Sequence, residues 1–189
     1  MYYGAIKKCD IANGEGIRVS LFVSGCRNKC KGCFQPETWD FCYGNFFDDF
    51  AMNEILSAAE NPSVRGLSIL GGEPLEPENQ ADVLSILRNF KTKYPQKTVW
   101  LYTGFLYEEL IADNSDSRAK LPITCDILSL IDVLVDGRYD EEKKRIGLRF
   151  RGSENQRIID MNKTRATGEI VIWDGCKLDK SYNNNEETN

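Results

Sequence analysis

Short apolar segments that alternate with helical patterns are the feature that most restricts how this chain can fold. Residues 17–23 place apolar side chains at every second position, which indicates a strand. Three further apolar segments have the length of strands, namely residues 67–70, 98–102 and 132–135. Between them lie helical patterns, one of which Pro77 opens and Pro95 closes. This alternation predicts an α/β fold with parallel βα units.

Weaker patterns complete the expected organisation. Helical spacing also recurs at residues 50–59, 106–111 and 127–131, and weaker strands are expected near 148–150, 157–159 and 170–173. A chain of 189 residues suits one domain, which we expect over residues 1–180. Residues 181–189 are polar, and we expect a disordered tail there.

Each of the four main predicted strands ends in small or polar residues. They are followed in turn by Cys26, Cys30 and Cys33; by Gly71, Gly72, Glu73 and Pro74; by Thr103 and Gly104; and by Asp136 and Gly137. Parallel α/β proteins bind ligands at the carboxyl ends of their strands. These four loops therefore predict one composite site.

Charge and composition exclude several classes of function. The net charge of -5 gives no general attraction for nucleic acid or anionic membranes, and we expect neither as a partner. No apolar run approaches the roughly 18 residues of a membrane span, and the start lacks a signal peptide. We therefore expect a cytoplasmic protein. Histidine is absent, which removes imidazole ligands and the usual general base.

Three of the seven cysteines, Cys26, Cys30 and Cys33, lie within eight residues. In a reducing compartment such a group indicates a metal site rather than disulfides. Three thiolates would leave one iron of a four-iron cluster open to a substrate, whereas ordinary sites use four ligands. Neighbouring cations such as Arg27 and Lys31 are expected to favour the thiolate form.

Each motif also has an ordinary structural interpretation. A zinc site could be completed by one of the remaining cysteines, Cys9, Cys42, Cys125 or Cys176. Gly-Gly-Glu-Pro is a common turn between a strand and a helix, and glycine and aspartate occur in turns anyway. The cysteine loop and the Gly-Gly-Glu-Pro loop support each other because they follow successive strands.

The cysteine spacing resembles that of the radical S-adenosylmethionine superfamily. The resemblance implies a 4Fe–4S cluster on Cys26, Cys30 and Cys33, whose open iron chelates the amino and carboxylate groups of S-adenosylmethionine. Reduction then splits the sulfonium into methionine and a 5′-deoxyadenosyl radical. Gly71, Gly72, Glu73 and Pro74 resemble the motif that meets the amino group.

Further contacts to S-adenosylmethionine follow from the same resemblance. The superfamily often has an aromatic residue before the third cysteine, where this chain has Gly32. The adenine ring is therefore expected to contact Gly32, Cys33 and Phe34. Thr103 and Asp136 are weaker candidates for positioning S-adenosylmethionine, and Asp136 could instead position a cation or the substrate loop.

Over residues 2–173 the chain most resembles the anaerobic ribonucleoside-triphosphate reductase activating proteins. The matching segments are 13–18 (Asn-Gly-Glu-Gly-Ile-Arg), 32–34 with Thr38-Trp39, 132–137 (Asp-Val-Leu-Val-Asp-Gly) and 150–153 (Phe-Arg-Gly-Ser) with Gln156-Arg157. Periodicity alone predicts only a charged loop for the last segment.

The resemblance implies an activating enzyme that takes hydrogen from one glycine of the large reductase subunit, after a flavodoxin-like donor reduces the cluster. The expected fold is a partial, open (β/α) barrel of the radical S-adenosylmethionine type, because the strands are too few for eight. Pyruvate formate-lyase activating enzyme is the nearest alternative. From another class, a zinc or electron-transfer module could bind a partner without catalysis. Colour distinguishes these, since a reconstituted iron–sulfur protein is brown and a zinc protein is colourless.

Overall fold

The computed structural model describes residues 1–114 and 116–176. Its strands are β1 (Tyr2–Asp10), β2 (Ile17–Val23), β3 (Asn45–Phe46), β4 (Val64–Gly71), β5 (Thr98–Tyr102), β6 (Val133–Asp136) and β7 (Arg157–Asp160). Its helices are α1 (Asp49–Ala58), α2 (Pro77–Lys93), α3 (Tyr107–Ile111), α4 (Thr124–Leu130) and α5 (Met161–Thr167). Short 3₁₀ turns lie at Pro36–Trp39, Glu141–Lys143 and Asp174–Cys176.

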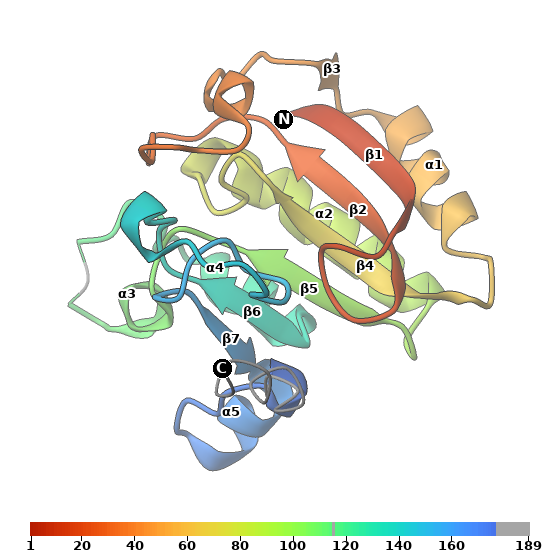
Figure 1. The fold of residues 1–189 in the computed structure, drawn as a ribbon. Coiled ribbons are helices and arrows are strands. Elements are labelled where there is room, and N and C mark those ends of the chain that lie inside the picture. The colour runs from red at the N-terminus through yellow and green to blue at the C-terminus, as the bar shows by residue number, and fades with distance from the viewer. Residues whose placement is uncertain (115, 177–189) are drawn as a thin grey trace, which may run out of the picture.

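All the strands belong to one open sheet in the order β3-β1-β2-β4-β5-β6-β7 (Figure 1). The four strands that the sequence predicts most clearly, β2, β4, β5 and β6, are parallel neighbours. Antiparallel strands flank them, with β1 beside β2 and β7 beside β6. The α/β class and the parallel core are therefore confirmed, and the sheet does not close into a barrel within the described residues.

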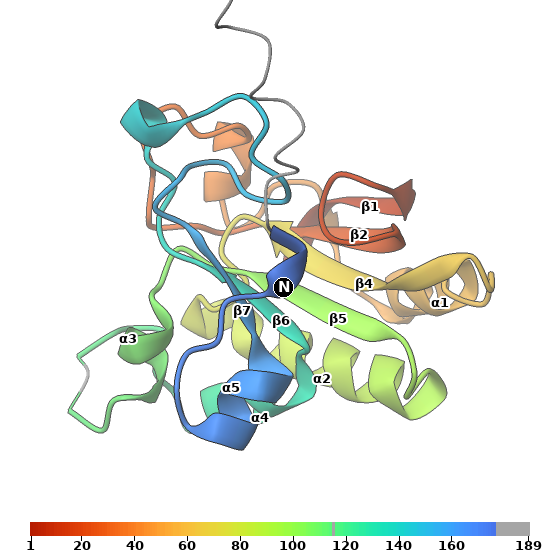
Figure 2. The same ribbon diagram turned by 60° about the horizontal axis from the view of Figure 1, so that its bottom comes forward.

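The helices cover one face of the sheet, and long connections cover the other (Figure 2). Successive side chains of β5 lie on opposite faces of the sheet. Val99 and Leu101 pack in the main core, whereas Trp100 packs in a smaller cluster with Val133 and Val135. The connection that follows β2 and the one between β6 and β7 both lie on the face without helices. This face has room for a site because no helix fills it.

Several edge elements differ from the expectations. Strand β1 was not expected, since its residues are mixed polar and mostly half-buried or exposed. Residues 148–150 form no strand, because Phe150 has a left-handed φ of 58° that breaks an extended chain. Only an isolated bridge, between Ile159 and Ile172, forms in the segment 170–173. The expected tail at 181–189 lies outside the described residues.

No helix within residues 1–114 and 116–176 has the length and apolar character that crossing a membrane requires.

Candidate functional site

A cavity of about 530 Å³ opens at the carboxyl ends of the parallel strands. The four predicted loops all contribute to its lining: Cys26, Cys30 and Cys33 after β2, Gly71, Gly72 and Glu73 after β4, Thr103 and Gly104 after β5, and Gly137 after β6. The four loops therefore meet around one cavity, as expected. This follows from the parallel order, which brings four strand ends to the same edge.

The three clustered cysteines are the thiols of this cavity. Cys26 is buried, and Cys30 and Cys33 are partly exposed. Of the other cysteines, Cys9, Cys42 and Cys125 are exposed and lie outside the lining, and the side chain of Cys176 is outside the described part of the chain. Within the described residues no three His, Cys, Asp or Glu side chains converge as they would around one metal ion.

An iron–sulfur cluster places a different demand on three thiols than a single ion does. Each thiolate binds its own iron, so the sulfurs need to surround a common space rather than one point. A cavity lined by all three cysteines meets that demand. The donor set therefore fits a cluster with three protein ligands.

The expected activation of these thiols by neighbouring cations is wrong for Cys26. Burial raises the pKa of the Cys26 thiol to about 11. Arg27 is directed away from it, toward Glu76 and Glu78, and Lys31 lies 3.7 Å from Glu141. A metal bound at Cys26 would itself have to favour the thiolate form.

Backbone hydrogen bonds fix the path of the chain where it enters the cysteine loop. Gly25 N–H donates to Thr38 O at 2.8 Å and Cys26 N–H to Trp39 O at 3.2 Å. From the next loop, Glu73 N–H donates to Gly25 O at 2.8 Å. A Cβ on Gly72 would lie 2.7 Å from that same oxygen, so only glycine permits the two loops to approach this closely.

Glu73 joins the loops at three strand ends. Its carboxylate is fully buried and accepts four hydrogen bonds, from Leu75 N–H at 3.0 Å, Asn28 Nδ2 at 3.0 Å, Thr103 Oγ1 at 2.8 Å and Gly104 N–H at 2.7 Å. Burial raises the pKa of Glu73 to about 7, against the effect of these donors. The side chain thus positions the lining, and its acceptors are already used.

A second buried carboxylate, Glu76, holds the cysteine loop from behind. It accepts from the Arg27 N–H at 2.8 Å and from the Arg27 side chain at 2.8 Å. Arg118 donates to it at 2.9 and 3.0 Å and also to Asn28 Oδ1 at 2.8 Å. Burial alone would raise the pKa of Glu76, but these two guanidinium groups hold it below its usual value.

The connection between β6 and β7 closes the cavity opposite the sheet. The Tyr139 ring packs on Phe34 with centroids 4.9 Å apart, and a Cβ on Gly152 would lie 3.2 Å from the Phe34 ring. Gln156 fixes this connection, since its side chain accepts from Gly152 N–H at 2.8 Å and donates to Gly137 O at 2.9 Å. Phe150, Arg151, Gly152 and Gln156, from the segment for which periodicity alone predicts a charged loop, therefore form a wall of the cavity.

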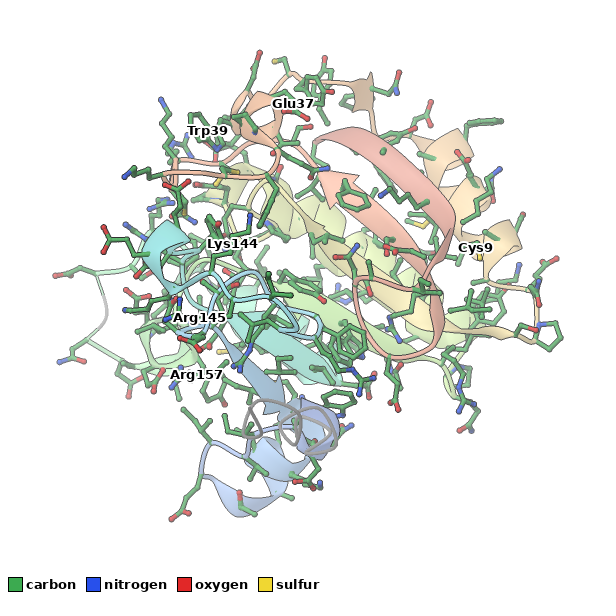
Figure 3. The ribbon with its side chains drawn as sticks, in the orientation of Figure 1. Cys9, Glu37, Trp39, Lys144, Arg145 and Arg157 are labelled. Atoms are coloured by element: carbon green, nitrogen blue, oxygen red, sulfur yellow. The ribbon has the colours of Figure 1, made fainter. Side chains whose placement is uncertain are left out.

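Three predicted site residues lie outside the lining. Asp136 is fully buried, pairs with Arg157 through Nε at 2.9 Å and accepts from Tyr107 N–H at 2.8 Å. Gly32 adopts a φ of +69°, and a Cβ there would meet the side chain of Glu141. Pro74 is buried behind the lining. Arg157 and the connection that precedes it are visible in Figure 3.

The segment before β2 supplies another part of the wall. Asn13 and Ala12 line the cavity. Arg18, fully buried below them, donates to Ser68 Oγ at 2.7 Å and to Leu67 O at 2.8 Å. Asn28, Lys7 and Tyr139 also line the cavity and were not expected to do so. Asn28 could have been expected from its position within the cysteine loop, and Lys7 only if strand β1 had been recognised. The sequence carries no signal for Tyr139.

Comparison with known proteins identifies the family of the chain. Residues 12–159 match the model of the 4Fe-4S single cluster domain. The chain is 39% identical over 160 residues to the anaerobic ribonucleoside-triphosphate reductase-activating protein of Pasteurella multocida, covering 84% of this chain and 96% of the relative. The chain belongs to this family of activating proteins.

Two further relatives carry the same name. The activating protein of Enterobacteria phage T4 is 34% identical over 158 residues, covering 84% of this chain and 93% of its own length. That of Escherichia coli K12 is also 34% identical over 158 residues, covering 82% and 96%. The expected resemblance to the activating proteins is thus confirmed, and the match to the 4Fe–4S domain spans the whole cavity lining from Ala12 onward.

Proposed function

We propose that this chain activates anaerobic ribonucleoside-triphosphate reductase by installing a glycyl radical on its large subunit. The observation that carries the proposal is the meeting of Cys26, Cys30 and Cys33 with the ends of the three other parallel strands around one cavity. The names of the relatives support the choice of reductase as the partner.

The lining residues can be assigned to the two cofactors that this function needs. Cys26, Cys30 and Cys33 would hold a 4Fe–4S cluster and leave one iron open. S-adenosylmethionine would lie beside it, against the backbone of Gly71 and Gly72. When bound and reduced, this pair supplies a carbon radical that can take a hydrogen atom.

The roles of the protein's own groups follow from their contacts. Phe34 offers an exposed ring at the lining for adenine, next to the backbone of Cys33. Glu73 and Thr103 keep the strand-end loops in register through their mutual hydrogen bond at 2.8 Å. We therefore assign Glu73 to positioning the backbone that meets the amino group, since its carboxylate already accepts four bonds.

The open sheet suits a macromolecular substrate. We propose that it is a partial (β/α) barrel of the radical S-adenosylmethionine type within a single domain of residues 1–180. A glycine is a suitable target because its backbone, without a side chain, can enter a narrow cavity. We further propose a flavodoxin-like electron donor and a reducing cytoplasm as the place of action, where free thiols persist.

The decisive experiment is electron paramagnetic resonance on the anaerobically reconstituted, reduced protein. It is mixed with S-adenosylmethionine and either the large subunit of anaerobic ribonucleoside-triphosphate reductase or pyruvate formate-lyase. We expect a glycyl radical on the reductase alone. A radical only on pyruvate formate-lyase would support that alternative, and a colourless protein that binds zinc would contradict the function altogether.

A further inference from the structure

The side chain of Asn28 connects the cysteine loop with the loops after β4 and β5. It is half-buried and lines the cavity. Its Nδ2 donates to Glu73 Oε2 at 3.0 Å, and its Oδ1 accepts from Arg118 at 2.8 Å. A Cβ on Gly104 would lie 2.3 Å from Nδ2, so the amide nitrogen lies directly against the loop after β5.

These two contacts determine which way the Asn28 amide faces. A guanidinium group can only donate, so the atom that meets Arg118 has to be the amide oxygen. The amide nitrogen is then directed at the carboxylate of Glu73, which accepts. The reversed amide would place donor against donor at one end and oxygen against oxygen at the other. Asn28 therefore presents its N–H groups, and not its oxygen, beside Glu73.

One hydrogen of this amide is not used by the contacts around Glu73. Three of the four donors to this carboxylate have a single hydrogen, namely Leu75 N–H, Gly104 N–H and the Thr103 hydroxyl. Asn28 Nδ2 has two hydrogens, and Glu73 accepts one of them. Within residues 1–114 and 116–176 no second acceptor meets Nδ2, so this nitrogen can donate to a ligand.

Arg118 reaches the Asn28 amide from the connection between α3 and α4. Its guanidinium donates to the two oxygens of Glu76 at 2.9 and 3.0 Å and lies over the Phe105 ring, 4.6 Å from the ring centroid. The Glu76 side chain is fully buried, which gives this cation a fixed anchor. Arg118 can therefore hold the amide in one orientation, and its charge makes the amide N–H groups stronger donors.

An N–H donor at this position suits an anionic oxygen. Asn28 lines the same cavity as the three clustered cysteines and the Gly71 backbone. The proposed function places the methionine end of S-adenosylmethionine there, and that end carries the one carboxylate of the molecule. The oxygens of Glu73 already accept four hydrogen bonds, so a donor for a second carboxylate has to come from another side chain.

We propose that Asn28 binds the carboxylate of S-adenosylmethionine through the second hydrogen of its amide, and that Arg118 is a positioning residue for this amide. The inference rests on the proposed function and adds to it a residue that selects for the carboxylate.

Decarboxylated S-adenosylmethionine separates this contact from all others, because it keeps the sulfonium, the adenosine and the amino group. Binding of both ligands to the cluster-loaded protein is measured by anaerobic equilibrium dialysis. We expect Asn28→Ala to weaken the binding of S-adenosylmethionine at least about tenfold, and that of the decarboxylated ligand less than about twofold. An equal loss for both ligands, or no loss for either, would overturn the proposal.

A second substitution keeps the test valid if Asn28→Ala prevents cluster loading. Asn28→Ser retains one hydrogen, which Glu73 would accept, so this variant should show the same selective loss. Iron content and thermal unfolding verify that each variant is loaded and folded. Asn89→Ala is the matched control, because Asn89 is an exposed residue of α2 that donates to Ser85 O. It should bind both ligands as the unaltered protein does.

Variants of Arg118 test the positioning role. Arg118→Ala should weaken S-adenosylmethionine binding about three- to tenfold and spare the decarboxylated ligand. Arg118→Lys, which still carries a donor for the amide oxygen, should recover most of the affinity. A merely structural role would weaken both ligands alike, and that result would contradict the assignment. Arg88→Ala is the control, since Arg88 forms an exposed pair with Asp126.

The unaltered protein separates failure of this inference from failure of the proposed function. If it binds S-adenosylmethionine but forms no glycyl radical on the reductase, the proposed function is wrong, while the two ligands still test Asn28. If it forms the radical and the Asn28 variants bind both ligands normally, only the inference is wrong. If the loaded protein binds no S-adenosylmethionine, both are wrong.

Discussion

Glu73 illustrates how one side chain can organise a site without offering free acceptors to a ligand. Its carboxylate takes one donor from the cysteine loop, two from the loop after β5 and one from its own turn. A buried carboxylate is costly unless such donors compensate for lost hydration. The loops that form the cavity are therefore coupled to one another through a single residue.

Replacing Glu73 by Gln should loosen this coupling. The amide would direct a donor at Asn28 or Gly104, so a hydrogen-bond donor would be left unpaired and the free energy of unfolding should fall by about 1–3 kcal/mol. We expect weaker S-adenosylmethionine binding at the same time, measured by calorimetry on the loaded protein. Glu78→Gln is the control, since its ion pair with Arg27 is exposed and should contribute little. Unchanged affinity and stability in the Glu73 variant would contradict the positioning role.

The location of each cysteine, in the cavity lining or away from it, predicts whether the cluster needs it. Cys26→Ala, Cys30→Ala and Cys33→Ala should each prevent cluster assembly and end S-adenosylmethionine cleavage, measured as bound iron and as 5′-deoxyadenosine. Cys9→Ala, Cys42→Ala and Cys125→Ala should retain the iron, because these thiols are exposed and away from the lining. Retention of a full cluster without Cys30 would overturn the ligand assignment.

At the scale of elements, the parallel core is readable from sequence and its edges are not. Strand β2 has alternating apolar residues, the segments 67–70, 98–102 and 132–135 are short and mostly apolar, and helix α2 begins at the expected Pro77. Strand β1 carries no such pattern, since much of it is half-buried. It is held by pairing with β2, which local periodicity does not record.

The same limit applies to the candidate site. The loops after the parallel strands could be expected to converge, because strand direction alone determines where those ends lie. The wall formed by the connection between β6 and β7 could not be predicted from the sequence. Gln156 and Tyr139 hold it in place through contacts with residues far away in the chain, Gly137 and Phe34. Asp136 had the same sequence signal as Thr103, yet its pairing with Arg157 directs it into the structure.

Asp132 joins several elements and should make stability depend on pH. It accepts from Lys91 of α2 at 2.6 Å, from the Val99 N–H of β5 at 2.8 Å and from Asn162 of α5 at 3.1 Å. Burial alone would raise the pKa of Asp132, but these donors, Lys91 first, hold it below its usual value. Its stabilising effect is therefore complete above the unfolded pKa of about 4 and is lost as pH falls below it.

The variant Asp132→Asn should be less stable at neutral pH by about 1–2 kcal/mol. Its free energy of unfolding should also decline less steeply than that of the unaltered protein as the pH falls below about 4. Urea unfolding followed over this range provides the measurement. Asp126→Asn, which breaks the exposed pair with Arg88, serves for comparison. Parallel pH profiles for the Asp132 variant and the unaltered protein would count against this account.

At the scale of the whole molecule, the division of the sheet into two faces creates the site. Helices fill one face, and the other is left to the cysteine loop and the wall between β6 and β7 (Figure 2). Several protein contacts hold these parts together: backbone bonds between the loops after β2 and β4, the two buried carboxylates, and Gln156. Small zinc domains differ, because there the metal supplies the folding energy.

Chelation of iron should therefore leave the fold intact. We expect the far-ultraviolet circular dichroism of the stripped protein to match that of the loaded protein, with a thermal midpoint lower by only a few degrees. Collapse of the secondary structure on iron removal would contradict this. An enzyme of anaerobic metabolism meets oxygen by accident, and oxygen destroys such clusters. Because the hydrogen bonds around Gly25 and Glu73 hold the loops in place, we expect that iron and sulfide resupplied after such damage rebuild the cluster on the same polypeptide.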